Sequence, residues 1–137
     1  MGYLDFLFVG YSGRIGRLTY WVASFALSVI ELVVIWGLLQ LAHGTLADLT
    51  QYSHGDEVAL SSAQAWDVFQ HVVLPAIIVS LVFLWPQYAV TTKRWHDRGK
   101  SGWWSLIVLV PIIGALWAFI ELGFLPGENG VNHYGYR

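Results

Sequence analysis

The sequence has no cysteine among its 137 residues. This absence excludes disulfides, iron–sulfur clusters and thiol catalysis. Charged residues are also scarce, at 12% against roughly 25% in soluble domains, whereas 56% of the residues are hydrophobic. A soluble fold of this size could not bury so many apolar side chains, because small domains leave much of their surface exposed. The composition therefore predicts an integral membrane protein.

Three long apolar runs, about residues 18–42, 70–92 and 103–125, contain very little charge. Each run has the ~20 residues that a membrane-spanning helix needs. Residues 1–11 are apolar and aromatic but too short to span, so they predict a segment lying in the membrane interface. The expected fold is an all-α integral membrane protein with three transmembrane helices and a short interfacial N-terminal segment, forming a single transmembrane domain over residues 1–137. Prolines within the second and third runs predict kinks.

Most basic residues lie on one side of this arrangement, and only Arg137 falls on the other side if three helices span. Residues 43–69 lack Lys and Arg but contain four acids: Asp48, Asp56, Glu57 and Asp67. Six of the seven basic residues precede the first run or separate the second run from the third: Arg14, Arg17, Lys93, Arg94, Arg98 and Lys100. Because cytoplasmic flanks collect Lys and Arg, the N-terminus and the basic loop 93–102 are expected in the cytoplasm. The protein is expected to be a multi-pass protein of a bacterial inner (plasma) membrane. Its acidic loop 43–69 and its C-terminus are expected on the outer side of that membrane.

The third run admits an alternative, because VPIIG (residues 110–114) could be the turn of a re-entrant hairpin. Each arm would have about 8 to 10 residues, or ~12–15 Å of helix, and the tail would then be cytoplasmic. A kinked single span is favoured because a turn facing lipid leaves backbone polar groups unpaired.

The segment KRWHDRGKSGWW, residues 93–104, predicts a face that binds anionic membrane lipids or a partner protein. Its tryptophans suit the headgroup level, and cations beside a membrane helix attract anionic lipid. Ser101 is the expected N-cap of the third helix. The candidate binding residues are Arg14, Arg17, Lys93, Arg94, His96, Asp97, Arg98, Lys100, Trp103 and Trp104. The alternative is that the segment only anchors the chain and fixes its orientation.

Ionisable residues inside the apolar runs suggest a second function. Glu31 and Glu121 would both fall in the outer half of the membrane, and His71 begins the second run on that side. Such residues often handle protons or ions, so this intramembrane polar cluster would belong to a small proton- or cation-linked transporter or channel. The alternative is a protonated Glu hydrogen-bonded between helices, or Glu121 reaching the outer interface.

A third hypothesis is a membrane-embedded enzyme that uses His96 and Asp97. Neighbouring residues on a helix do not face each other, so pairing of Asp97 with an arginine, Arg14 or Arg17, is favoured instead. No catalytic residue is assigned. The five histidines have no metal-ligand spacing and GYSGRIG is no dinucleotide loop, so neither a metal nor another cofactor is expected.

Four pieces of the sequence resemble a bacterial membrane family catalogued as domain of unknown function 805: GRIGRLTYW, RWHDRGKSGWW, PIIG and PGENGVNHYG. Trp95 and Thr19 depart from the family pattern, in which Leu and an acid are usual. The resemblance implies a small multi-pass inner-membrane protein and brings no established activity. The positions that match its motifs are Arg14, Arg17, Arg94, His96, Asp97, Gly99, Ser101, Gly102, Asn132, Tyr134 and Gly135. Asn132 and Tyr134 are expected to fold the tail back onto the helices.

The leading functional prediction is therefore a non-enzymatic envelope protein that binds anionic lipid or a partner through its basic, aromatic cytoplasmic loop. Three helices bury little surface, so a homo-oligomer or a larger membrane complex is expected. The near-neutral net charge of −2 predicts no nucleic-acid partner.

Overall fold

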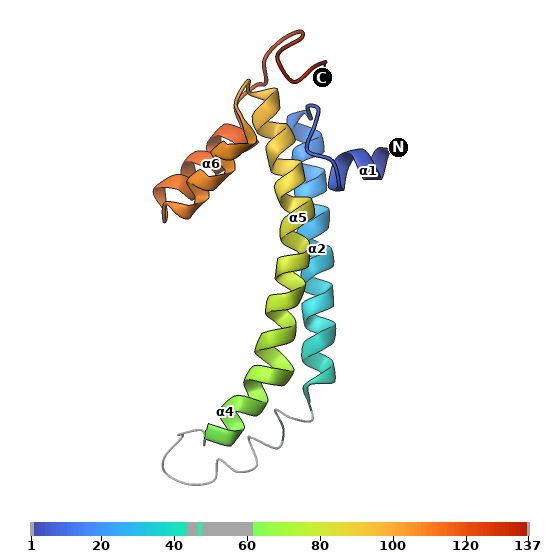
Figure 1. Ribbon diagram of the computed structural model, residues 1–137, viewed down its shortest axis with the longest axis vertical. Helices are drawn as coiled ribbons and strands as arrows, with labels where there is room; N and C mark the ends of the chain where they lie inside the picture. Colours follow the sequence, from blue (N-terminus) through green and yellow to red (C-terminus); the bar gives the residue numbers. More distant parts are fainter. Residues whose placement is uncertain (1, 44–46, 48–61, 137) are drawn as a thin grey trace. The chain divides into compact units, whose positions relative to one another are not determined.

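The computed structural model describes residues 2–43, 47 and 62–136, and every element in these ranges is helical apart from an isolated bridge between Asn132 and Gly135 (Figure 1). The chain divides into two compact units. The first combines residues 1–28 with residues 84–137, and the second consists of residues 29–83. The all-α prediction is confirmed for the described part of the chain.

Two helices are long and apolar enough to cross a membrane. The first is α2, Arg17–Leu41, and the second is the continuous helix Ser62–Asp97. The second combines α4 (Ser62–Val68), the π-helical turn η1 (Phe69–Val73) and α5 (Leu74–Asp97). Only 6% and 0% of their apolar windows are buried within the chain, which suits helices whose side chains face lipid. The predicted helices 18–42 and 70–92 are therefore confirmed as helices, and Pro86 lies inside α5.

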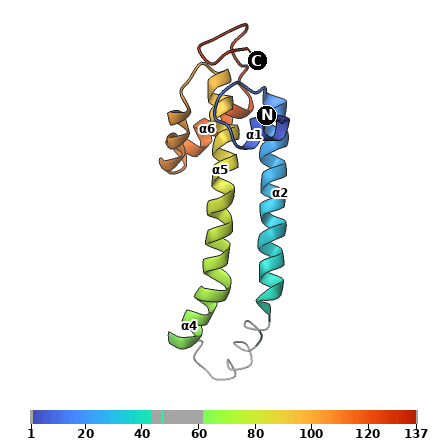
Figure 2. The same ribbon diagram turned by 45° about the vertical axis from the view of Figure 1, so that its right-hand side comes forward.

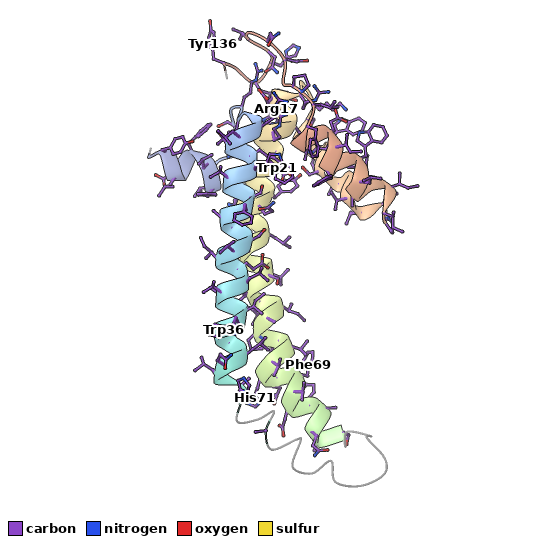
Figure 3. All side chains as sticks on the ribbon, turned by 180° about the vertical axis from the view of Figure 1, so that it is seen from behind. Arg17, Trp21, Trp36, Phe69, His71 and Tyr136 are labelled. Atoms are coloured by element: carbon purple, nitrogen blue, oxygen red, sulfur yellow. The ribbon has the colours of Figure 1, made fainter. Side chains whose placement is uncertain are left out.

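The second unit contains residues 29–41 of α2 and residues 62–83 of the second long helix. Large apolar side chains such as Trp36 and Phe69 are exposed there, at 63% and 38% (Figure 3). Asp67 lies in α4, so the last part of the predicted acidic loop 43–69 is helical. Its other acids, Asp48, Asp56 and Glu57, lie outside the described residues.

The third apolar run forms a hairpin, so the prediction of one helix over 103–125 is wrong. Residues 102–109 form the 3-10 helix η2 (Gly102–Leu109), and after a turn the chain continues as α6 (Ile113–Gly123). The eight residues of η2 rise about 16 Å and the eleven of α6 also about 16 Å. Neither arm reaches the ~30 Å of a hydrocarbon core. The chain thus takes the form of the alternative hairpin about VPIIG.

The turn of the hairpin depends on two residues. Ile112 has a positive φ of 63°, which is unusual for a β-branched residue. Gly114 lies so close to the other arm that a Cβ there would be 1.7 Å from the Ile107 carbonyl oxygen. The arms therefore touch through the backbone just beyond the turn, and η2 and α6 lie side by side near the end of α5 (Figures 1 and 2).

The core of the first unit lies between the end of α5 and the hairpin. Trp95, Ala118 and Leu122 are buried together, with Tyr20 and Ile107 packed against them. Gly99 ends α5 with a φ of +69°, and Lys100 N–H donates to the Trp95 carbonyl while Gly99 N–H donates to that of His96. This is a Schellman motif. It turns the chain directly into η2, whose predicted N-cap, Ser101, accepts a hydrogen bond from Trp103 N–H.

Candidate functional site: a buried charge cluster at the end of α5

Three charged side chains, Arg14, Arg94 and Asp97, form what we call the charge cluster. All three have fully buried side chains. One Asp97 oxygen lies 3.1 Å from an Arg14 nitrogen, and the other carboxylate oxygen pairs with Arg94, one turn earlier on α5. A Cβ on Gly127 would be 1.9 Å from this carboxylate, so the tail packs directly on it. The predicted pairing of Asp97 with an arginine is seen here, with Arg14.

The two arginines bind main-chain carbonyls as well as Asp97. Arg14 donates to the carbonyls of Gly130, at 2.6 Å, of Gly135, at 3.1 Å, and of Glu128. Arg94 donates to the carbonyl of Leu122, at 2.7 Å, and to that of Leu125. Leu122 lies in the last turn of α6, where a cation complements the negative end of the helix dipole. The arginines therefore hold the tail and the end of the hairpin against α5.

Lys93 binds the N-terminal segment in the same manner. Its ammonium donates to the Leu7 carbonyl at 2.9 Å and to that of Gly10, and it lies 5.3 Å from the ring centre of Phe6. Leu7 belongs to α1 (Tyr3–Phe8), the short helix that was predicted as an interfacial segment. Lys93 is fully buried, so its charge is used inside the protein.

His96 is held by the tail and by the segment before α2. Its ring stacks on Tyr134 with centres 3.8 Å apart and planes within 3°, and its Nδ1 lies 3.2 Å from the Gly13 carbonyl oxygen. Asn132 donates to the His96 carbonyl and accepts from Tyr134 N–H. Asn132 and Tyr134 therefore fold the tail back, as predicted. Because arginines occupy the Asp97 carboxylate, a His96–Asp97 relay finds no support.

Glu121, Lys100, Arg98 and Trp117 form a second group, the Glu121 cluster. Lys100 and Trp117 both bind the Glu121 carboxylate, and an Arg98 nitrogen lies 3.6 Å from it. Burial raises the pKa of Glu121, but the hydrogen bonds and charges of its partners outweigh burial and bring the pKa below its usual value. Glu121 is thus ionised at neutral pH. Lys100 also lies 4.8 Å from the ring centre of Trp104.

The predicted cluster of Glu31, His71 and Glu121 stays a prediction, but the position expected for Glu121 changes. That residue was placed in the outer half of the membrane on the assumption that 103–125 is one span, whereas the hairpin brings it back to Lys100, just before η2. Glu31 and His71 belong to the other unit. There, His71 Nδ1 lies 3.0 Å from the Asp67 carbonyl oxygen.

The remaining predicted residues lie nearer the surface. Arg17 and Trp21, one turn apart on α2, donate to the carbonyls of Phe124 and Gly123 at the end of α6 (Figure 3). Arg98 binds the Pro126 carbonyl, but its side chain keeps 22% exposure, and that of Lys100 keeps 29%. Trp103 and Trp104 are 75% and 42% exposed.

Sequence reasoning missed several partners in these groups. Glu128 accepts from Asn132, Trp117 binds Glu121, and a run of carbonyls accepts from the buried cations. Every residue has a main-chain carbonyl, so the sequence does not show which carbonyls accept from a buried cation. The tail motif PGENGVNHYG was the available signal, because its glycines contact Arg14 and Asp97, and its Asn132 donates to the His96 carbonyl.

These features agree with the comparisons with known proteins, which place the chain in a class of small helical inner-membrane proteins. The chain belongs to the family described as Protein of unknown function (DUF805), whose model matches residues 8–136. It is similar to the inner membrane protein YhaH of Escherichia coli K12, with 33% identity over 128 residues, covering 93% of this chain and 86% of the relative. It is also similar to the inner membrane protein YhaI of the same organism, with 27% identity over 129 residues, covering 93% and 85%. No solved structure matches the chain.

Proposed function

We propose that this protein is a non-enzymatic inner-membrane protein that crosses the membrane twice. The N-terminus, the basic residues and the tail lie in the cytoplasm, and the hairpin dips into the cytoplasmic leaflet. The positive-inside rule supports the cytoplasmic N-terminus. The contacts of Arg14 with Gly130 and Gly135 support a tail on that same side, because no helix of spanning length separates the tail from α5 in the described residues.

We further propose that the cytoplasmic face binds anionic lipid through Arg98, Lys100 and Trp103. The observation that carries this proposal is that Arg98 and Lys100 share one carboxylate, Glu121, and both keep exposed charge. The Lys100 ammonium lies 4.8 Å from the ring centre of Trp104, which is 42% exposed, and partly exposed cations beside a tryptophan are suited to the headgroup region. The predicted set of lipid-binding residues narrows accordingly, because Arg14, Lys93 and Arg94 are fully buried in contacts of their own.

The test changes the charge of this face in both directions. Arg98→Gln removes a cation, and Glu121→Gln removes the ionised carboxylate that offsets Arg98 and Lys100. Affinity for short-chain phosphatidylglycerol is measured by native mass spectrometry of the detergent-solubilised protein. We expect Arg98→Gln to weaken phosphatidylglycerol binding about fivefold, because each cation near an anionic lipid contributes ~1 kcal/mol to binding. We expect Glu121→Gln to strengthen binding.

Two controls accompany these variants. Arg98→Lys keeps the charge and should bind as the parent does, and phosphatidylcholine should show little difference among the proteins. If both charge variants bind phosphatidylglycerol with the affinity of the parent, the proposed lipid-binding face is rejected.

A further inference from the structure

A groove of about 380 Å³ lies where α1 meets the first turn of α2. Its lining includes Tyr3 and Phe6 from α1, Arg14 and Ile15 from the connecting segment, and Leu18 and Thr19 from α2. None of these residues belongs to the Glu121 cluster. The groove combines apolar rings, a hydroxyl group and a guanidinium, and so has both polar and apolar walls.

The groove contains the positive end of a long helix. The first intrahelical hydrogen bond of α2 runs from Tyr20 N–H to the Gly16 carbonyl. The N–H groups of Arg17, Leu18 and Thr19 therefore have no carbonyl partner within the helix. The first turn carries no acidic side chain, and Arg17 adds a positive charge to it. This helix end is suited to an anion.

Arg14 supplies a second, independent indication. Arg14 is one of the residues that line the groove, its side chain is fully buried, and two of its nitrogens bind Asp97 and the tail. Its third nitrogen, Nε, is buried and has no hydrogen-bond partner among the residues that the structure describes. A buried N–H of a charged group without an acceptor is costly, and a ligand oxygen in the groove would satisfy it.

We infer that this groove binds the phosphate of an anionic membrane lipid. The phosphate oxygens accept from Arg14 Nε, from the free N–H groups of the first turn and from the Thr19 hydroxyl. A lipid is favoured over free phosphate because the groove is bordered by exposed apolar surface, with Tyr3 66% and Leu18 77% exposed, which would contact the glycerol and acyl groups. This inference rests on the proposed anionic-lipid function and adds a specific site to it.

The test places a carboxylate where the phosphate would sit. Thr19→Glu should weaken phosphatidylglycerol binding about fivefold in the same mass-spectrometric assay. The melting temperature should stay level or rise, because an acid in the first turn complements the helix dipole. A misfolded protein would instead show both weaker phosphatidylglycerol binding and a lower melting temperature. Thr19→Gln is the matched neutral control. Ser12→Glu adds the same negative charge at an exposed position that is not among the groove residues named above, and so controls for a general effect of charge on lipid binding.

The outcomes separate this inference from the proposed function. If Thr19→Glu binds no worse than Thr19→Gln or Ser12→Glu, the groove is not the lipid site. If Arg98→Gln nevertheless weakens binding, the proposed function stands without this site. Inorganic phosphate is added as a competitor. Displacement of phosphatidylglycerol by an equal concentration of inorganic phosphate would assign the groove to free phosphate and overturn the lipid assignment.

Discussion

At the scale of single residues, the buried cations Arg14, Lys93 and Arg94 are hydrogen-bonded mainly to backbone carbonyls. Asp97 is the carboxylate of the charge cluster and serves two arginines, whereas Arg14, Lys93 and Arg94 together bind carbonyls from α1, α6 and the tail. Buried charges persist only when they are paired and hydrogen-bonded. The carbonyl oxygens supply the hydrogen-bond acceptors that the single carboxylate of Asp97 cannot provide for all three cations.

Replacing Asp97 with Asn should destabilise the fold strongly. The change leaves Arg14 and Arg94 buried beside a neutral amide, and breaking a buried ion pair typically costs about 3–5 kcal/mol. Thermal unfolding in detergent micelles, followed by circular dichroism, measures the loss. Asp5→Asn is the control, because Asp5 is exposed and its side chain accepts a hydrogen bond from the nearby Gly2 N–H in the described structure. A loss no larger than that of the control would show that the charge cluster contributes little to stability.

Part of this cluster could be predicted from the sequence. The pairing of Asp97 with Arg14 or Arg17 was expected, because a lone acid in a basic segment requires such a partner. The sequence did not distinguish the two arginines. Arg17 lies within α2 and bonds to Phe124, whereas Arg14 precedes the helix and reaches both Asp97 and the tail. That choice depends on tertiary geometry.

At the scale of elements, the hairpin of η2 and α6 is the feature that hydropathy could not decide. Residues 103–125 are apolar for as long as a spanning helix, and Pro111 with Gly114 fits either a kink or a reversal. The deciding contacts are those of Glu121 with Lys100 and Arg98, which join the two ends of the run. The helices α2 and α5, by contrast, follow directly from uninterrupted apolar length.

Gly114→Ala should open or distort the hairpin. The added methyl group would lie 1.7 Å from the Ile107 carbonyl oxygen, so the arms must separate, and overpacking of this kind typically costs about 1–3 kcal/mol. Gly37→Ala is the matched control, because nothing lies within 4 Å of its added methyl group. Alanine in a helix interior should stabilise α2 by about 0.5–1 kcal/mol. Thermal unfolding of both variants, with effects of opposite sign, is the expected result; equal effects would contradict the tight approach at Gly114.

At the scale of the whole molecule, the proposed topology differs from the three-span prediction in the location of the tail. Charge asymmetry alone predicted the N-terminal side and left the tail dependent on the third run. The tail contacts Arg14 through Glu128, Gly130 and Gly135. Such contacts join residues more than 100 positions apart, and no local sequence pattern predicts them.

Cysteine labelling in intact cells tests this topology. The sequence has no native cysteine, so each introduced thiol reports on one position alone. Asp56→Cys should react with a membrane-impermeant maleimide, whereas Asn129→Cys should react only after the membrane is permeabilised. The physical reason is that the hairpin returns the tail to the side of the basic residues. Labelling of Asn129→Cys in intact cells would restore the three-span arrangement.

The long-range contacts of Arg14 also set the order in which the protein can be completed. Its partners lie 83 to 121 residues further along the chain, so residues 128–135 are synthesised only after both long helices. Until then the guanidinium lacks the carbonyls that it binds in the finished protein. Arg14 therefore completes its contacts only after the tail has been made, and a protein truncated before Glu128 would hold its first residues only through α5, by the contacts of Lys93 with Leu7 and Gly10, of His96 with Gly13 and of Asp97 with Arg14.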